Sequence, residues 1–149
     1  MSIPVDARSG RAPGVRGPAF LRGLAGAGVG VGGLATGYGT TILVAAARSY
    51  CDAAWEPQHR FAFSIIDWPG MELLCLVAAV AVWVGARRLT AELPIAWRGI
   101  VPAALVLLAL AVVAIGCFAL LGTPSAYHGD SGLCPPSNIP PWWPSWLPA

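Results

Sequence analysis

"GIVPAALVLLALAVVAIGCFALLG", residues 99–122, decides the fold class, because it contains 24 residues and no charged side chain. At a rise of about 1.5 Å per residue, a helix of this length crosses the roughly 30 Å hydrocarbon core of a bilayer. Pro102 falls in the first turn of that helix, where a missing N–H costs no hydrogen bond. The segment therefore predicts a transmembrane helix.

The composition of the whole chain also indicates a membrane protein. Hydrophobic residues make up 56% of the 149 residues and charged residues only 11%, whereas about a quarter of a soluble domain is charged. The net charge is +2, and no basic stripe with interleaved aromatic residues occurs, so we expect no nucleic-acid partner. All nine basic residues are arginine, which together with frequent Ala, Gly and Pro predicts a GC-rich bacterial source.

A second span is predicted over residues 69–86. Pro69 is placed as a helix-start residue. Glu72 would lie near one membrane interface, with Arg87 and Arg88 at the other. The uncharged part is short, so we expect local bilayer thinning or snorkelling side chains to cover its ends.

The first span is predicted over residues 24–47, which carry no charge but contain seven glycines. In a bilayer the backbone must satisfy its own hydrogen bonds, and a helix is the remaining option. Residues 28–33 match the pattern G-x-G-x-x-G. A dinucleotide site also needs a preceding strand and an acidic residue about 20 positions later. The preceding residues form no strand pattern and the next acid is Asp52, so we expect no nucleotide.

These glycines instead predict helix packing. Small residues four apart leave a groove in which another helix can approach closely. The chain contains three such pairs, Gly26 with Gly30, Gly28 with Gly32, and Gly33 with Gly37. The partner is left open at this stage, because either the other two spans or another chain could occupy these faces.

Arginine positions predict an inside N-terminus and an outside C-terminus, because short cytoplasmic loops carry the excess of positive charge. Seven arginines lie in the N-terminal tail and in the loop between the second and third spans, against two on the other side: Arg8, Arg11, Arg16, Arg22, Arg87, Arg88 and Arg98 against Arg48 and Arg60. Residues 1–18 are predicted to be a disordered cytoplasmic tail, and residues 19–122 a three-helix transmembrane domain. A cleavable signal peptide and a two-span topology are the alternatives, and both fit less well.

The outside part would comprise residues 48–67 and the tail 123–149. The tail has seven prolines in 27 residues, which exclude a regular helix. Its three tryptophans, Trp142, Trp143 and Trp146, predict an amphipathic contact surface for headgroups, for the chain itself or for another protein.

The four cysteines fall into two pairs by depth. Cys51 and Cys134 would both lie outside, where a disulfide can form. Cys75 and Cys117 would lie within the second and third spans, at similar depth in antiparallel neighbours. We expect them to be small buried side chains, with a thiol relay as the alternative.

No metal site or cofactor is predicted. The two histidines, His59 and His128, stand on separate outer segments without tight ligand spacing. Glu72, at the membrane edge, is a further candidate because acids within spans are often functional.

Together these features predict an all-α, three-span protein of the bacterial cytoplasmic membrane, surrounded by lipid. We expect a non-enzymatic accessory or assembly subunit of a membrane complex. The alternatives are a membrane thiol oxidoreductase that uses Cys51/Cys134 and Cys75/Cys117, and a homo-oligomeric channel or small transporter.

Overall fold

The computed structural model describes residues 17–95, 97–124 and 129–149, apart from the side chains of residues 17–22. Within these ranges all regular structure is helical. Three helical segments are long and apolar enough to cross a membrane, which confirms the predicted all-α class and the three spans as candidates. Residues 1–16 of the expected cytoplasmic tail lie outside the described residues, and so does His128.

Helix α1 covers Gly17–Cys51 and is longer at both ends than the predicted span. Its threonine hydroxyls leave no unpaired polar group within the apolar run, because each donates a hydrogen bond to a backbone carbonyl one turn earlier. Thr36 Oγ1 lies 2.9 Å from the Gly32 oxygen, and Thr41 Oγ1 lies 3.0 Å from the Gly37 oxygen. The helix ends at Cys51, immediately before Asp52, which has a φ of 53°. That left-handed conformation stops a helix.

The expected outer segment 48–67 is largely helical. Helix α2 covers Pro57–Ala62, the π-helical segment η1 covers Phe63–Asp67, and α3 covers Trp68–Leu89. Together they form one continuous helical stretch of 33 residues, part of which is apolar enough to cross a membrane. The sequence analysis placed the start of this span later, at Pro69, because a proline is typical of the first turn of a helix.

The last span is formed by α4, Trp97–Cys117, and the π-helical segment η2, Phe118–Gly122. It covers the predicted residues 99–122 and begins two residues earlier. Pro102 was predicted in the first turn, but because the helix begins at Trp97 it is the sixth residue and lies inside the helix, where it is buried. Residues 129–149 follow an irregular path with isolated turns.

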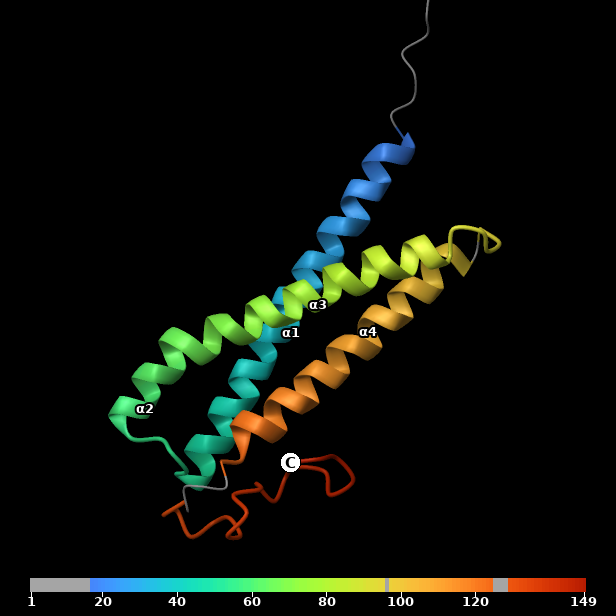
Figure 1. The fold of residues 1–149 in the computed structure, drawn as a ribbon. Helices are drawn as coiled ribbons and strands as arrows, with labels where there is room; N and C mark the ends of the chain where they lie inside the picture. The colour runs from blue at the N-terminus through green and yellow to red at the C-terminus, as the bar shows by residue number, and fades with distance from the viewer. Residues whose placement is uncertain (1–16, 96, 125–128) are drawn as a thin grey trace, which may run out of the picture.

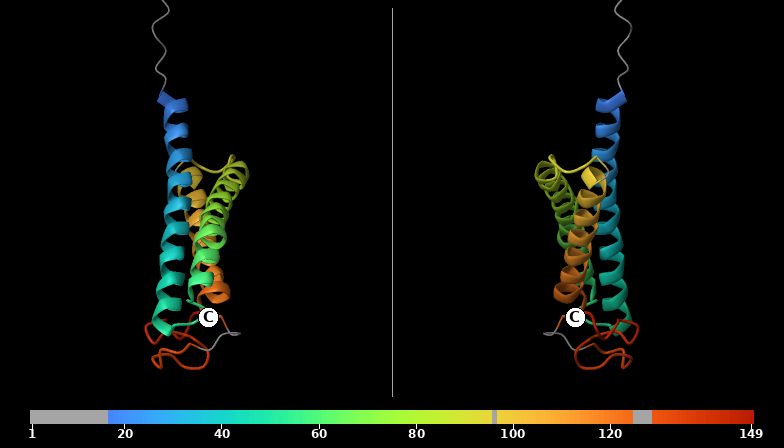
Figure 2. Two further views of the ribbon diagram at one scale, coloured as in Figure 1. Left: turned by 90° about the vertical axis from the view of Figure 1, so that its left-hand side faces the viewer. Right: turned by 90° about the vertical axis from the view of Figure 1, so that its right-hand side faces the viewer.

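The three long helices form a bundle in which α3 crosses α1 and runs beside α4 (Figure 1). The C-terminal tail lies across the ends of α1 and η2, and we call this the cap end. At the opposite end a short loop joins α3 to α4, and we call this the loop end. Figure 2 shows that the start of α1 extends past this loop.

The crossing of α1 over α3 depends on two glycines. A Cβ at Gly37 would lie 2.5 Å from the Glu72 Cα, and one at Gly33 would lie 3.0 Å from the Leu76 Cα. These distances leave no room for a side chain, so the two helix backbones meet directly. This is the close approach that small residues permit within a membrane.

The buried core lies mainly between the crossing and the cap end. One cluster joins all three helices and consists of Val44, Ala47, Phe63, Met71, Cys117 and Phe118. A second cluster joins α3 to α4 and consists of Cys75, Ala79, Val106 and Leu110. Both clusters lie on the faces that the helices turn toward each other, and the remaining faces expose large aliphatic side chains suited to lipid.

Candidate functional site

A groove opens between α1 and α4 toward the loop end. It has a volume of about 370 Å³ and an almost wholly apolar lining. Its α1 wall includes Gly28, Gly32 and Thr36, its α4 wall includes Val106 and Leu110, and Trp83 of α3 also lines it. The groove exists because α1 contacts α3 extensively but α4 only to a small extent.

The structure divides the six glycines of the three predicted pairs into two sets. Gly33 and Gly37 are pressed against α3, and a Cβ at Gly30 would lie 3.7 Å from the Leu76 side chain. Around Gly26 and Gly28, by contrast, a Cβ would meet no described atom within 4 Å. The same holds for Gly32, the second member of the Gly28 pair. The Gly28–Gly32 pair therefore faces the groove and is not used by the described part of the chain.

An arginine stands beside the wall of this groove. The Arg87 guanidinium lies 5.2 Å from the centre of the Trp83 ring, a cation–π contact. Within the described residues, neither Arg87 nor Arg88 has a carboxylate within ion-pair distance. The loop end therefore carries an excess of positive charge next to the open groove, since Arg87, Arg88 and Arg98 outnumber Glu92 there.

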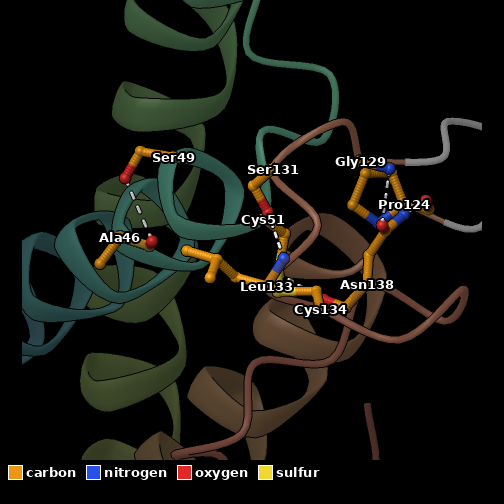
Figure 3. The surroundings of a disulfide bond; sticks show 9 residues. All are labelled: Ala46, Ser49, Cys51, Pro124, Gly129, Ser131, Leu133, Cys134 and Asn138. Carbon is orange, nitrogen blue, oxygen red and sulfur yellow. Dashed lines mark hydrogen bonds between the residues drawn. A yellow bond between two sulfur atoms is a disulfide. The ribbon is translucent and has the colours of Figure 1, made fainter.

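At the cap end, a disulfide joins Cys51 of α1 to Cys134 of the tail, the pair that the sequence predicts. Figure 3 shows Asn138 beside this bond, between Pro124 and Gly129. The Asn138 amide donates to the Pro124 carbonyl at 2.8 Å, and the Gly129 N–H donates to the Asn138 side-chain oxygen at 3.0 Å. Asn138 is 1% exposed and has a φ of 56°, a conformation that asparagine tolerates better than most residues.

The three tail tryptophans have different surroundings. Trp143 stacks on Phe118 of η2, with ring centroids 3.6 Å apart. Trp142 meets Phe118 edge-on at 6.3 Å and stays 44% exposed, whereas Trp146 is 79% exposed. Trp143 therefore holds the tail on the bundle, and only Trp142 and Trp146 are available for an external contact.

Arg48 is a buried residue at the cap end whose role the sequence analysis did not find. It is 9% exposed, and its Nε donates to the Leu121 carbonyl of η2 at 2.6 Å. Its guanidinium also lies 5.3 Å from the centre of the Phe63 ring in η1. Arg48 thus connects α1 to both π-helical segments. In the sequence, Arg48 is distinguished only as a single charge at the end of an uncharged run. It stands three residues before Cys51, which was predicted to form a disulfide.

The remaining polar candidates lie at several places in the bundle. Cys75 and Cys117 are free and buried, and Glu72 accepts a hydrogen bond from the Trp68 indole at 2.8 Å. His59 lies 3.9 Å from a Glu56 oxygen. Within the described residues, no three His, Cys, Asp or Glu side chains gather in a way that could hold a metal ion.

Comparison with known proteins yields no relative. No family model, curated protein or solved structure matches this chain. Three features of the chain itself remain as functional candidates: the groove, the exposed part of the cap, and the buried sulfur-containing side chains.

Proposed function

We propose that this chain is a non-enzymatic accessory subunit of a bacterial membrane complex, and that its groove between α1 and α4 receives a transmembrane helix of a partner. The observation that carries the proposal is the unfilled Gly28–Gly32 pair in the wall of that groove. In lipid no hydrophobic force drives helices together, so association depends on close packing. The groove offers such packing at a place that the chain's own helices leave open.

The shape of the groove suits a helix. One wall is flat, because Gly28 and Gly32 expose backbone, and the other wall is formed by branched side chains such as Val106 and Leu107. A helix with small residues on one side and aliphatic residues on the other would contact both walls. The exposed Trp142 and Trp146 supply a second contact at the cap end, near the outer headgroups.

We further propose that the cap end lies outside the cytoplasm and the loop end inside. The disulfide supports this orientation, because such bonds persist in oxidising compartments. The positive-inside rule supports it independently, since Arg87, Arg88 and Arg98 lie at or next to the loop end. A membrane-impermeant thiol reagent, applied to reduced intact cells, should label Cys134 if the orientation is correct.

The test uses the full chain purified from its native membranes in mild detergent, with quantification of any protein that copurifies. We expect a stoichiometric partner with the wild type, and its loss in Gly28→Leu and Gly32→Leu, because a leucine fills the groove. Gly39→Leu is the matched control, because Gly39 also lies in open space but does not line the groove.

Three results would contradict the proposal. One is a clean monomer in the wild type, and another is a partner retained equally in all three variants. The third is a homo-oligomer that Gly28→Leu dissociates, which would favour the self-assembling channel instead.

A further inference from the structure

A second apolar groove lies between α3 and α4, and we call it the lateral groove. It has a volume of about 580 Å³ and is lined only by glycine, alanine, valine and leucine. The small residues Gly85, Ala86 and Ala109 leave the space, and a Cβ at Gly85 would meet no described atom within 4 Å. The lateral groove shares no lining residue with the groove between α1 and α4.

The lateral groove is open to the surroundings of the bundle and reaches the loop end. Two of its leucines, Leu89 and Leu108, are 86% and 62% exposed. Leu89 is also the last residue of α3, and from there a short loop leads to α4, which lies beside α3 (Figure 1). In a membrane-spanning bundle the groove would therefore face the lipid tails and end where the helices enter the headgroup layer.

An arginine of α4 lies in register with this groove. Arg98 precedes the groove residue Leu105 by seven residues, which is two helical turns or about 10 Å along the same face. Its Nε donates to the Leu93 carbonyl of the loop at 2.7 Å. That bond uses one of the five N–H donors of a guanidinium and holds the positive charge at the loop end of the groove.

The charges around this end of the groove favour an anion. Arg88 directly precedes the groove residue Leu89 and is exposed. Across the described residues 86–95 and 97–99, Glu92 is the only acidic residue. Neither Arg88 nor Arg98 has a carboxylate within ion-pair distance in the described part of the chain. The site thus combines an apolar groove with two arginines at its headgroup end.

We propose that the lateral groove binds one anionic phospholipid, with an acyl chain in the groove and the phosphate at Arg98 and Arg88. Basic pockets between transmembrane helices are a known form of site for anionic headgroups. A guanidinium can also donate two parallel hydrogen bonds to one phosphate. The expected ligand is a phosphodiester lipid whose headgroup carries no compensating positive charge, such as phosphatidylglycerol.

Charge complementarity favours a lipid over the helix of another protein. A phosphate is available at the headgroup layer wherever the loop end meets the bilayer, whereas a helix would need an acidic residue at this one depth. The inference requires only that the chain spans a membrane. It does not depend on the proposed partner subunit, because the two grooves have separate linings.

The test counts lipids bound to the purified full-length protein by native mass spectrometry from mild detergent. Phosphatidylglycerol and phosphatidylethanolamine with the same acyl chains are added in equal amounts. We expect saturation at one phosphatidylglycerol per chain and a preference of about tenfold over phosphatidylethanolamine, because the ammonium of the latter cancels the attraction to the arginines. This comparison uses the wild type and needs no substitution.

A pair of arginine variants tests the headgroup contact. Arg98→Gln should weaken phosphatidylglycerol binding about fivefold, the usual contribution of one arginine near an anionic membrane surface. Arg60→Gln is the matched control at the cap end. The Arg60 Nε also donates to a backbone carbonyl five residues earlier, that of Trp55, at 2.7 Å, so both variants lose the same kind of local bond.

A pair of glycine variants tests the acyl-chain contact. Gly85→Leu should weaken binding of both lipids about tenfold, because the leucine side chain replaces the acyl chain in its contacts with the groove. Gly116→Leu is the control, because Gly116 also lies in open space on α4 but does not line the lateral groove.

Equal retention of the two lipids by the wild type would overturn the proposal, and so would equal effects of Arg98→Gln and Arg60→Gln. A copurifying protein that Gly85→Leu removes would show that a helix occupies the lateral groove instead. Gly28→Leu should leave lipid retention unchanged, so this proposal and that of the partner groove fail separately.

Discussion

The cap end and the loop end of the bundle are held together in different ways. At the cap end, α1 is joined to the tail by the Cys51–Cys134 disulfide and to η2 by the Arg48 hydrogen bond, and the tail stacks on Phe118 through Trp143. At the loop end, α1 and α4 are separated by the groove. The chain therefore completes its own contacts at one end and leaves apolar surface open at the other.

The largest effect should come from removing the covalent link at the cap end. The disulfide closes a sequence separation of 83 residues, and a loop of that order restricts the unfolded chain by about 4 kcal/mol. We expect Cys51→Ser with Cys134→Ser to lower the free energy of unfolding by that amount, measured by denaturant titration in detergent micelles. An unfolding midpoint that reductant leaves unchanged in the wild type would contradict this expectation.

The next largest loss of stability should come from a change at the crossing of α1 and α3, which lies between the two ends. Gly37→Ala places a methyl group 2.5 Å from the Glu72 Cα, and overpacking of this kind costs about 2 kcal/mol. Gly39→Ala, two residues further along the same helix, meets no described atom within 4 Å and serves as the control. Equal unfolding midpoints for the two variants would show that the helices do not meet at Gly37.

A smaller loss of stability is expected from a substitution in the tail. Trp143→Leu removes the stacked contact with Phe118, and such aromatic pairs contribute about 1 kcal/mol beyond simple burial. Trp146→Leu should leave the unfolding midpoint unchanged because Trp146 is 79% exposed. Limited proteolysis gives an independent readout, with faster cleavage of the tail in the first variant only. A larger loss of stability in Trp146→Leu than in Trp143→Leu would mean that Trp146 holds the tail on the bundle.

The smallest effect is expected at the loop end. Gly28→Ala adds a methyl group into open space, so the free energy of unfolding of the isolated chain should change by less than about 0.5 kcal/mol. A clear loss of stability in the isolated protein would show that the chain itself occupies the groove, which would remove the contrast between the ends.

Much of the fold follows from local sequence. The uncharged run 99–122 and the apolar residues after Pro69 predict helices because a bilayer leaves the backbone no other way to satisfy its polar groups. The ends of helices were harder to predict. Pro57–Asp67 joins the second span although His59, Arg60 and Asp67 interrupt its apolar pattern, because contacts such as Phe63 in the core stabilise a helix that hydropathy alone does not indicate.

The candidate sites, like the fold, could be predicted from the sequence only in part. The pairing of Cys51 with Cys134 followed from their predicted placement on one side of the membrane, and the glycine spacing predicted close packing. The spacing could not tell Gly37 from Gly28, because both have a glycine four residues away. Asn138, which holds the tail beside the disulfide, gave no signal at all, since its partners lie in backbone that only the folded tail brings near.

By itself, the sequence determined that this is a helical protein with three candidate membrane spans, because span length and charge are properties of each segment alone. Only the tertiary structure decided which glycines meet α3, where Arg48 is buried, and that Met71 lies with Cys117. Those outcomes depend on the angle at which α1 crosses α3. That angle is set by side chains far apart in the chain and cannot be derived from the periodicity of any one helix.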